Sequence, residues 1–190
     1  VGGGEDFGFL IVSWVEVRCA RPEAYLVIAG EGPARDSLAA QVNRLGLAGD
    51  VAFVGYLDRE RTLADCYAAA AVFVFASRTE TQGLVLLEAM AQGCAVVSTA
   101  ELGTASILQP GCGARVAPEQ PIAFAQAVID LLDDPARAAR CGALARDYAR
   151  GWSAGRMAGR LHEFYAEQCA RAKIARGLPP AAPGESNERQ

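Results

Sequence analysis

Histidine and excess basic charge are both scarce in this sequence, and each scarcity argues against a class of function. The 190 residues contain one histidine, His162, and their net charge is −4. A nucleic-acid-binding protein usually presents a basic face, so this charge balance gives no support for a nucleic-acid partner. His162 lies beside Leu161, Phe164 and Tyr165 in a predicted helix, which favours a structural role over a catalytic one.

Long apolar segments and paired cysteines are missing as well. The longest apolar run, 67–76, has about half the length that a membrane-spanning helix needs. The chain does not open with a charged segment followed by an apolar one, so we expect no signal peptide. The six cysteines include no Cys-x-x-Cys pair. This spacing favours reduced, separately buried thiols in a cytoplasmic protein over a disulfide frame or a zinc site.

What the sequence does contain is a regular alternation of apolar runs and helical stretches. Its length fits roughly one domain, and its 52% of hydrophobic residues can form a core. Apolar runs predict strands over 25–29, 50–54, 71–76, 94–98 and 114–116. Helices are predicted between them over 34–45, 59–70, 83–92 and 104–108. This order predicts an α/β fold: right-handed βαβ units and a Rossmann-like parallel sheet with helices on both faces.

The last third of the sequence predicts C-terminal helices and then a tail. One helix is predicted over 121–132, a second begins at Pro135, and a third runs from Ser153 to residue 175. We predict that the domain spans 1–176 and that the proline-rich, polar segment 177–190 is a disordered tail. The basic residues near the end of the third helix favour a solvated helix end over contact with anionic lipid; they are Arg171, Lys173 and Arg176.

The two glutamates Glu80 and Glu88 lie eight positions apart in a strongly apolar segment. A carboxylate in such surroundings is costly unless a partner satisfies it, and a hydroxyl-rich ligand such as a sugar nucleotide is one such partner. The loop 77–82 leaves the carboxyl end of a predicted strand, where open parallel sheets bind ligands. The backbone N–H groups at 83–85 then open a helix and suit a phosphate group, with Glu88 further along within reach of a ribose.

Other interpretations of these residues remain open at the sequence level. Spacing alone is equally compatible with a solvated Glu80 and with a Glu88 that pairs with a core arginine. The Gly30-x-Gly32 segment follows a predicted strand but lacks the third glycine of a dinucleotide fingerprint, which disfavours a nicotinamide site. The acidic triplet of a metal-bound diphosphate site is missing, so we expect neither a metal nor another cofactor.

Taken together, a series of segments resembles the retaining glycosyltransferases of family 4, also described as glycosyl transferases of group 1. The segments are 26–33, 51–55, 77–91, 93–98 and 152–153, in the order that they have in the family. The resemblance covers residues 7 to 165 and implies the C-terminal, donor-binding half of a GT-B fold. It implies transfer of a sugar from a nucleoside-diphosphate sugar to a glycan or lipid, with the base, the sugar and the acceptor left open.

The resemblance also implies a role for each site residue. Glu80 matches the catalytic glutamate that contacts hydroxyls of the transferred sugar near the reacting carbon, and Glu88 matches the glutamate that holds the ribose. The other donor-binding positions lie near the diphosphate, the sugar and the nucleobase: Gly83, Leu84, Val85 and Leu57. Enzymes of this family need no metal, because basic side chains and a helix terminus stabilise the departing diphosphate.

Two departures from the family pattern leave a second hypothesis open. The family has an arginine just after the domain's first strand and a lysine shortly beyond it. Here Phe7 occupies the lysine position, no arginine precedes Arg18, and the first strand is missing or eroded. The N-terminal acceptor domain, which forms the other wall of the active-site cleft, is absent from this sequence. We therefore expect the isolated chain to be inactive.

The alternative hypothesis is a non-catalytic remnant or a regulatory module that binds a sugar nucleotide. For an enzyme completed by its N-terminal domain, the resemblance implies a role in polysaccharide or glycolipid biosynthesis. It further implies a cytoplasmic location, with contact at the inner face of the membrane.

Overall fold

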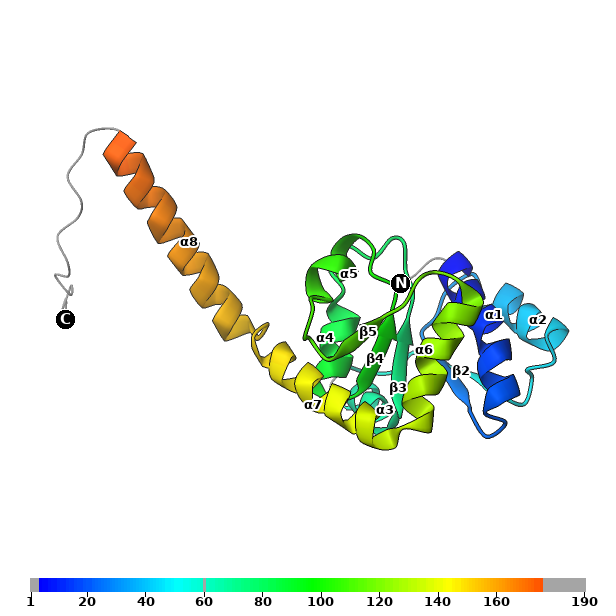
Figure 1. Cartoon of the computed structure of the whole chain (residues 1–190). Helices are drawn as coiled ribbons and strands as arrows, with labels where there is room; N and C mark the ends of the chain where they lie inside the picture. The colour runs from blue at the N-terminus through cyan, green and yellow to red at the C-terminus, as the bar shows by residue number, and fades with distance from the viewer. Residues whose placement is uncertain (1–3, 60, 176–190) are drawn as a thin grey trace. The chain divides into compact units, whose positions relative to one another are not determined.

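The computed structural model describes residues 4–59 and 61–175. They belong to two compact units, 1–150 and 151–190. Within the described residues, the first unit contains all of the strands and the helices α1 to α7, and the second contains the helix α8 (Figure 1). The tail predicted over 177–190 lies outside the described residues, and the domain predicted over 1–176 stays a prediction.

The first unit alternates strands and helices in the order that the sequence predicts. The strands are β1 (Leu26–Ala29), β2 (Val51–Gly55), β3 (Val72–Phe75), β4 (Ala95–Ser98) and β5 (Ala114–Val116). The helices between and after them are α2 (Arg35–Arg44), α3 (Thr62–Ala69), α4 (Leu84–Ala91), α5 (Leu102–Ile107), α6 (Pro121–Asp133) and α7 (Pro135–Arg150). The predicted α/β fold is confirmed.

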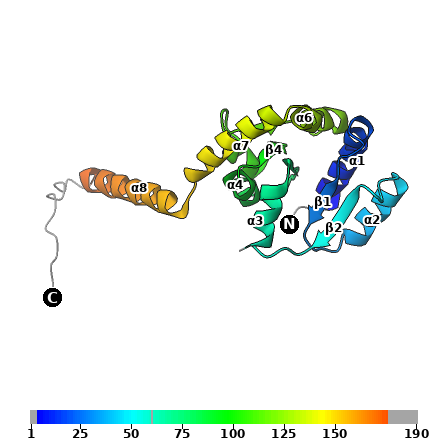
Figure 2. The ribbon, with the colours of Figure 1, turned by 90° about the horizontal axis from the view of Figure 1, so that it is seen from below.

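All of the pairings between described strands are parallel, but they form two separate sheets. One sheet pairs β1 with β2, and the other has the order β3-β4-β5. Figure 2 shows α6 and α4 on opposite sides of β4, and both helices pack against this strand. The parallel arrangement with helices on both faces agrees with the sequence prediction, whereas the division into two sheets was not predicted.

The helix α1 (Gly4–Ala20) was not predicted from the sequence. It buries Leu10, Ile11, Trp14 and Val17, and it packs mainly on α6 and α2. The spacing of these apolar residues by three and four positions is that of one helix face. The glycine-rich segment before them hides this signal, because glycine disfavours a helix.

One hydrophobic core holds both sheets. It joins Leu26 and Ile28 of β1 to Val97 of β4 through α1 and α6, with Phe124 of α6 almost fully buried. Figure 1 shows α1 and α6 side by side, in agreement with their extensive packing. The two sheets are therefore parts of one folded unit, although no strand pairing connects them within the described residues.

The cysteine prediction is correct in part. All six cysteines are free, and Cys94 and Cys112 are buried. Burial raises the pKa of the Cys94 thiol to about 11, so this thiol stays protonated at neutral pH. The prediction of burial is wrong for Cys19 and Cys169, which are exposed on α1 and α8.

The second unit is described only by α8 (Ala154–Ala175) and the turn before it. Side chains 154–172 of this helix are exposed, so the predicted structural role of His162 is not one of core packing. Arg171 is exposed as well, as a solvated helix end requires. Across the described residues, no helix combines the length and the apolar character needed to cross a membrane.

Candidate functional site

The predicted site residues lie on or near the loops that follow the carboxyl ends of the strands. Leu57 follows β2, Glu80 follows β3, and Glu88 lies on α4, the helix that comes after β3. Leu57, Glu80 and Glu88 are all half-buried. Each of them therefore lies on or near the loops at the carboxyl ends of the strands, where parallel α/β folds bind ligands.

The Glu80 carboxylate closes the turn that leads into α4. Its Oε1 accepts hydrogen bonds from the backbone N–H groups of Gly83 and Gln82, both at 2.8 Å. These bonds, that of Gly83 first, lower the pKa of Glu80, because they favour the charged form. Glu80 is therefore ionised at neutral pH and restrained by its own loop, and its role as a site residue or as a solvated loop residue stays a prediction.

Gly83 gives the start of α4 its shape. Its φ of 65° and ψ of 24° lie in the left-handed region, and a Cβ at this position would come within 2.8 Å of the Ile107 side chain. Leu84 and Val85 are the first two helical residues after it. Backbone N–H groups in the first turn of a helix lack intrahelical acceptors and form its positive end. The N–H group of Gly83 already donates to Glu80, so an anionic group at the start of α4 would use the N–H groups of Leu84 and Val85.

The Glu88 carboxylate is only weakly paired. Its Oε1 lies 3.8 Å from Nη2 of Arg59, a side chain that is 67% exposed. Its Oε2 is buried and has no hydrogen-bond partner among the described residues. The alternative interpretation predicted that Glu88 pairs with an arginine of the core, but its partner Arg59 is exposed and its contact with Glu88 is long. A buried oxygen without a partner is costly and is therefore rare in folded proteins.

The surroundings of Glu88 include α3 and the loop before it. Burial raises the pKa of Tyr67 above its usual range, and the negative charge of Glu88 raises it further. The ion pair with Arg59 connects Glu88 to the segment that begins at Leu57. The structure thus places Arg59, two residues after Leu57, beside Glu88, whereas no hydrogen bond or ion pair between described residues joins Glu80 to Glu88.

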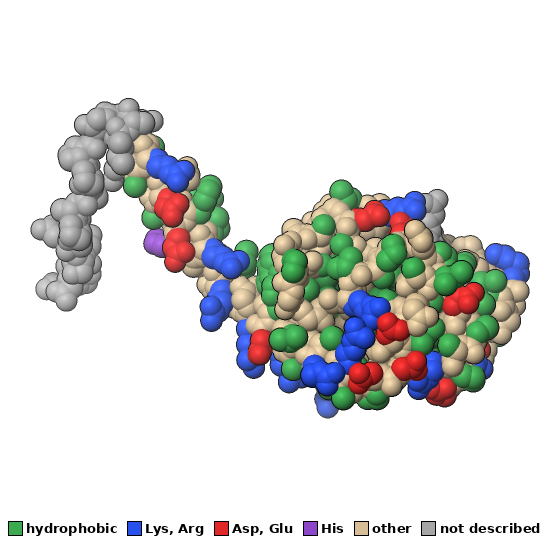
Figure 3. Space-filling view, viewed as in Figure 1, with side chains coloured by type: hydrophobic (Ala, Val, Ile, Leu, Met, Phe, Trp, Pro, Cys, Tyr) green, Lys and Arg blue, Asp and Glu red, His purple; other side chains and the backbone are tan. Residues whose placement is uncertain are grey.

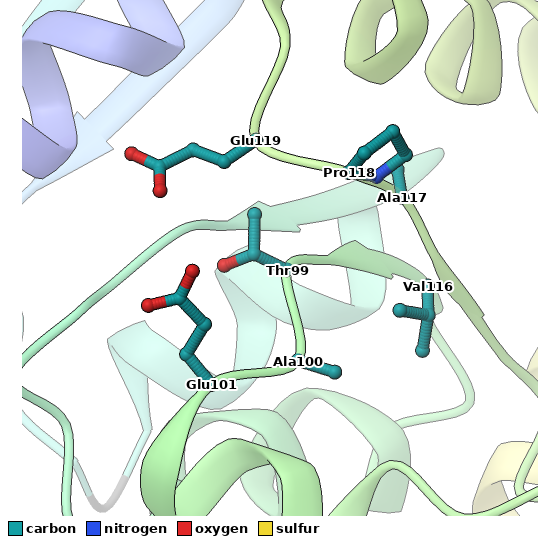
Figure 4. A pocket seen from close by; sticks show the side chains of 7 residues that line it. All are labelled: Thr99, Ala100, Glu101, Val116, Ala117, Pro118 and Glu119. Carbon is teal, nitrogen blue, oxygen red and sulfur yellow. The ribbon is translucent and has the colours of Figure 1, made fainter.

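A hollow of about 320 Å³ lies beyond the carboxyl ends of β4 and β5 (Figure 4). Its lining residues are Thr99, Ala100, Glu101, Val116, Ala117, Pro118 and Glu119. The sequence did not predict any of these residues as part of a site. In Figure 4 the polar ends of Thr99, Glu101 and Glu119 lie on the same side of the hollow. Ligands bind beyond the carboxyl ends of the strands in open parallel sheets. This rule predicted the Glu80 loop, and it could also have indicated the two loops that line the hollow.

Charge makes this hollow suitable for hydroxyl groups rather than for phosphates. It holds the carboxylates of Glu101 and Glu119. Arg78, which follows β3, contacts Glu119 in a bidentate pair, with Nε at 2.9 Å and Nη2 at 2.8 Å from the two carboxylate oxygens. Arg78 neutralises the charge of Glu119, so the repulsion of anions comes from the Glu101 carboxylate, while both carboxylates can accept hydrogen bonds.

The start of α5 joins the hollow to the Glu80 loop. The N–H group of Gly103 donates a hydrogen bond to the backbone carbonyl of Glu80 at 3.2 Å. A Cβ on Gly103 would lie 2.0 Å from the carbonyl oxygen of Thr81, so only glycine permits this approach. Leu102, next to it, has a φ of 46°, a strained value for a leucine. Such strain often occurs at ligand sites.

Metal ligands do not accompany these carboxylates. Across the part of the chain that the structure describes, no three histidine, cysteine, aspartate or glutamate side chains gather closely enough to hold a metal ion.

A family model and curated relatives both indicate which family the chain belongs to. The family model described as glycosyl transferases group 1 matches residues 5–134. The chain is 40% identical over 143 residues to D-inositol 3-phosphate glycosyltransferase 2 of Catenulispora acidiphila, covering 70% of this chain and 33% of that protein. It is 37% identical over 138 residues to glycogen synthase of Mycobacterium tuberculosis, covering 72% and 33%.

Solved structures agree with these relatives. The sucrose-phosphate synthase of Thermosynechococcus elongatus superposes with a TM-score of 0.73 at 30% identity, over 85% of this chain and 42% of that one. The chain spans about a third of the length of the curated relatives that it matches. The described fold therefore corresponds to one part of these larger proteins.

Proposed function

The chain belongs to the glycosyl transferases of group 1, and from this premise we propose that it is the donor-binding half of a retaining glycosyltransferase. The donor is a nucleoside-diphosphate sugar, and the acceptor is a glycan or a lipid. The relatives act on different acceptors by name, an inositol phosphate and glycogen among them. Because these names differ in the acceptor, the proposal leaves the acceptor to the rest of the protein.

The observation that carries this proposal is the buried Oε2 of Glu88, which has no hydrogen bond of ordinary length to a described residue, although the Tyr67 side chain lies close enough to interact with this carboxylate. A ribose diol supplies two hydroxyl donors, and a carboxylate accepts both. Such bonds to a charged group are worth about 1.5–3 kcal/mol each when the group is desolvated. Binding of the nucleotide would therefore satisfy an oxygen that the protein alone leaves unsatisfied.

The remaining groups fit the other parts of such a donor. The backbone at Gly83, Leu84 and Val85 opens α4 and is assigned to the diphosphate, because the helix dipole and the N–H groups of Leu84 and Val85 favour negative charge there, whereas the N–H group of Gly83 donates to Glu80. Leu57, two residues before the Arg59 that pairs with Glu88, lines the nucleobase pocket in this proposal.

Glu80 acts on the transferred sugar. Its carboxylate is ionised and fixed by two backbone N–H groups, so it can accept hydrogen bonds from sugar hydroxyls without reorganising. Positive charge that develops at the reacting carbon would be stabilised by such a nearby carboxylate. The departing diphosphate would be stabilised by the start of α4 and by basic groups of the complete active site.

The proposal assigns the other wall of the active site to an N-terminal acceptor domain, since the chain spans about a third of its relatives. It also places the enzyme in the cytoplasm and at the inner face of a membrane, and it leaves the exposed basic residues of α8 such as Arg171 to solvent.

Calorimetric titration with UDP, GDP and UDP-glucose tests the donor site. We expect at least one of these ligands to bind the chain, and Glu88→Gln to weaken that binding about tenfold or more, because a charged hydrogen bond to the ribose is lost. Glu163→Gln, an exposed change on α8, is the charge-matched control and should leave the affinity unchanged. Equal affinities for the wild type and Glu88→Gln would overturn the ribose assignment.

A further inference from the structure

The hollow beyond β4 and β5 has one apolar side and one polar side. Residues 116–118 form the apolar side with the side chains of a valine, an alanine and a proline. The polar ends of Thr99, Glu101 and Glu119 lie on the other side (Figure 4). An apolar wall with a few convergent polar groups is typical of sites for small organic ligands. As far as described residues form it, the lining includes no residue predicted for the donor site.

The Thr99 hydroxyl has no partner in the part of the chain that the structure describes. Thr99 is only 4% exposed, and its carbonyl oxygen accepts hydrogen bonds from the hydroxyls of Ser98 at 2.8 Å and Thr104 at 3.3 Å. Its own hydroxyl forms no hydrogen bond with another described residue. In Figure 4 the hydroxyl oxygen points towards the carboxylate side of the hollow. Because a buried hydroxyl without a partner is costly, this group is suited to a ligand in the hollow.

The two carboxylates determine which ligand chemistry the hollow accepts. Arg78 holds Glu119 and neutralises its charge, whereas Glu101 is exposed and adds a negative charge. An ionised carboxylate only accepts hydrogen bonds, so the ligand must donate them. A phosphate or a carboxylate on the ligand would be repelled by Glu101. The hollow therefore suits a ligand that has several hydroxyl groups and no negative charge.

From these observations we infer that the hollow is a binding site for one unit of an uncharged sugar or cyclic polyol. Its volume of about 320 Å³ lies at the lower end of the range for small-molecule sites, about 300–1,000 Å³. Hydroxyl groups at the edge of the ring donate to Glu101 and Glu119, and one of them accepts from the Thr99 hydroxyl. The C–H groups on one face of the ring contact residues 116–118.

This inference rests on the lining of the hollow and does not depend on the proposed function. A chain that bound no nucleotide could still bind a sugar here, and the reverse also holds. A free monosaccharide and one unit of a longer glycan present the same hydroxyl and C–H groups to the hollow. The two sources differ in what extends beyond it, so a glycan that makes further contacts binds more tightly than the single sugar.

Titrations of the whole chain followed by two-dimensional NMR test the inference. The probes are glucose, mannose, galactose and myo-inositol, with maltotriose as the glycan and glucose 6-phosphate as the anionic counterpart. We expect at least one uncharged probe to shift the amide signals of Thr99, Ala100, Val116 and Ala117 in a saturable way. Glucose 6-phosphate should bind the hollow about threefold more weakly than glucose or worse, because Glu101 repels it. Tighter binding of maltotriose than of glucose would identify a glycan as the source, and equal binding a single sugar.

Thr99→Val removes the hydroxyl and keeps the shape of the side chain. We expect it to weaken the binding of the sugar about threefold to tenfold, as for one lost hydrogen bond. It should unfold at the same or a higher urea concentration than the wild type, because no hydrogen bond of the folded chain is lost. Thr104→Val, which removes a partnered hydroxyl, should unfold at a lower one. Ser106→Ala, an exposed change on α5, is the control and should leave the affinity unchanged.

Glu101→Gln provides a second test at an exposed position, where a substitution is compatible with folding. It should weaken the binding of the uncharged sugar and reduce the discrimination against glucose 6-phosphate. Three outcomes would overturn the inference: no saturable shifts with any uncharged probe, affinities unchanged in both Thr99→Val and Glu101→Gln, or glucose 6-phosphate bound in the hollow as tightly as glucose. A Thr99→Val variant that is as unstable as Thr104→Val would also overturn it, because the hydroxyl would then have a partner within the chain.

Discussion

At Glu80 one carboxylate has both a structural and a proposed catalytic role. Its Oε1 accepts two backbone hydrogen bonds that close the turn before α4, and the proposal directs the carboxylate towards the donor sugar. In the proposal the same residue therefore shapes the start of α4 and accepts hydrogen bonds from the donor sugar. A substitution that keeps an acceptor oxygen but removes the charge can separate these two roles.

We predict that Glu80→Gln lowers stability in a pH-dependent way. The folded-state pKa of Glu80 is lowered, so its charge contributes stability that is present above the unfolded-state pKa and is lost as the pH falls through the folded-state pKa. The difference in unfolding free energy between wild type and variant should be largest near neutral pH and should vanish in strong acid. Urea denaturation at several pH values measures it, and a difference that is constant with pH would contradict the assigned hydrogen bonds.

The same variant should discriminate between two ligands. Glu80→Gln is expected to weaken the binding of a sugar nucleotide by about tenfold or more, as for a lost charged hydrogen bond, and to spare the binding of the corresponding nucleoside diphosphate. The comparison requires only the calorimetric titrations described for Glu88. An equal loss for both ligands would assign Glu80 to the shape of the helix start alone.

Among the structural elements, α4 and α7 approach each other most closely at two glycines. A Cβ on Gly142 of α7 would lie 2.0 Å from the carbonyl oxygen of Gly93, the residue that ends the turn after α4. Gly93 itself has a φ of 75°, as its predicted place after the helix requires. Arg146, one turn further along α7, donates a hydrogen bond to the carbonyl oxygen of Gln92 at 2.8 Å. α7 thereby holds the end of α4, the helix that carries Glu88.

We therefore predict that Gly142→Ala destabilises the first unit by about 1–3 kcal/mol or more, because the backbone of α7 must move away from Gly93. Ala143→Ser, an exposed change on the same helix, is the control and should stay within about 0.5 kcal/mol of the wild type. Chemical denaturation followed by circular dichroism gives both values. A stabilising effect of Gly142→Ala, as expected for a glycine in an open helix, would show that the two helices are not in close contact.

The elements also show how much the sequence could predict. Apolar runs and helix-ending glycines located each strand and most helices to within a few residues, because these signals are local. The helix α3 begins at Thr62 rather than at the predicted Arg59, because the Asp58 side chain accepts a hydrogen bond from the Arg61 N–H at 2.9 Å and forms a turn there. The absence of pairing between β1 and β3 was not predictable, since it depends on the order of strands in space.

The candidate site could likewise be predicted from the sequence only in part. Glu80, Gly83 and Glu88 belong to a continuous motif, so the sequence could name them before their positions were known. The weak pairing of Glu88 with Arg59 depends on the packing of α3 against α4. The hollow beside Thr99 and Glu119 is formed by two loops that only the pairing of β4 with β5 brings together.

For the molecule as a whole, we predict that the 190-residue chain binds a sugar nucleotide but does not transfer the sugar. The proposal assigns only donor-binding groups to this chain, and the chain spans about a third of the length of its relatives. Holding donor and acceptor together in the reactive orientation is worth about 7–11 kcal/mol of the barrier. A site that orients only the donor cannot supply this contribution, whatever its affinity.

The measurement is product formation from radiolabelled UDP-glucose and GDP-mannose with a mixture of glycan and lipid acceptors. Donor binding by calorimetry in the same preparation ensures that inactivity does not reflect an unfolded chain. Addition of the N-terminal half of a relative should restore transfer only where that half also supplies basic groups for the diphosphate, because Arg78, beside the site, is already paired with Glu119. Transfer by the chain alone that is lost in Glu80→Gln would mean that the described residues already position the acceptor, and the two-domain active site would have to be abandoned for this protein.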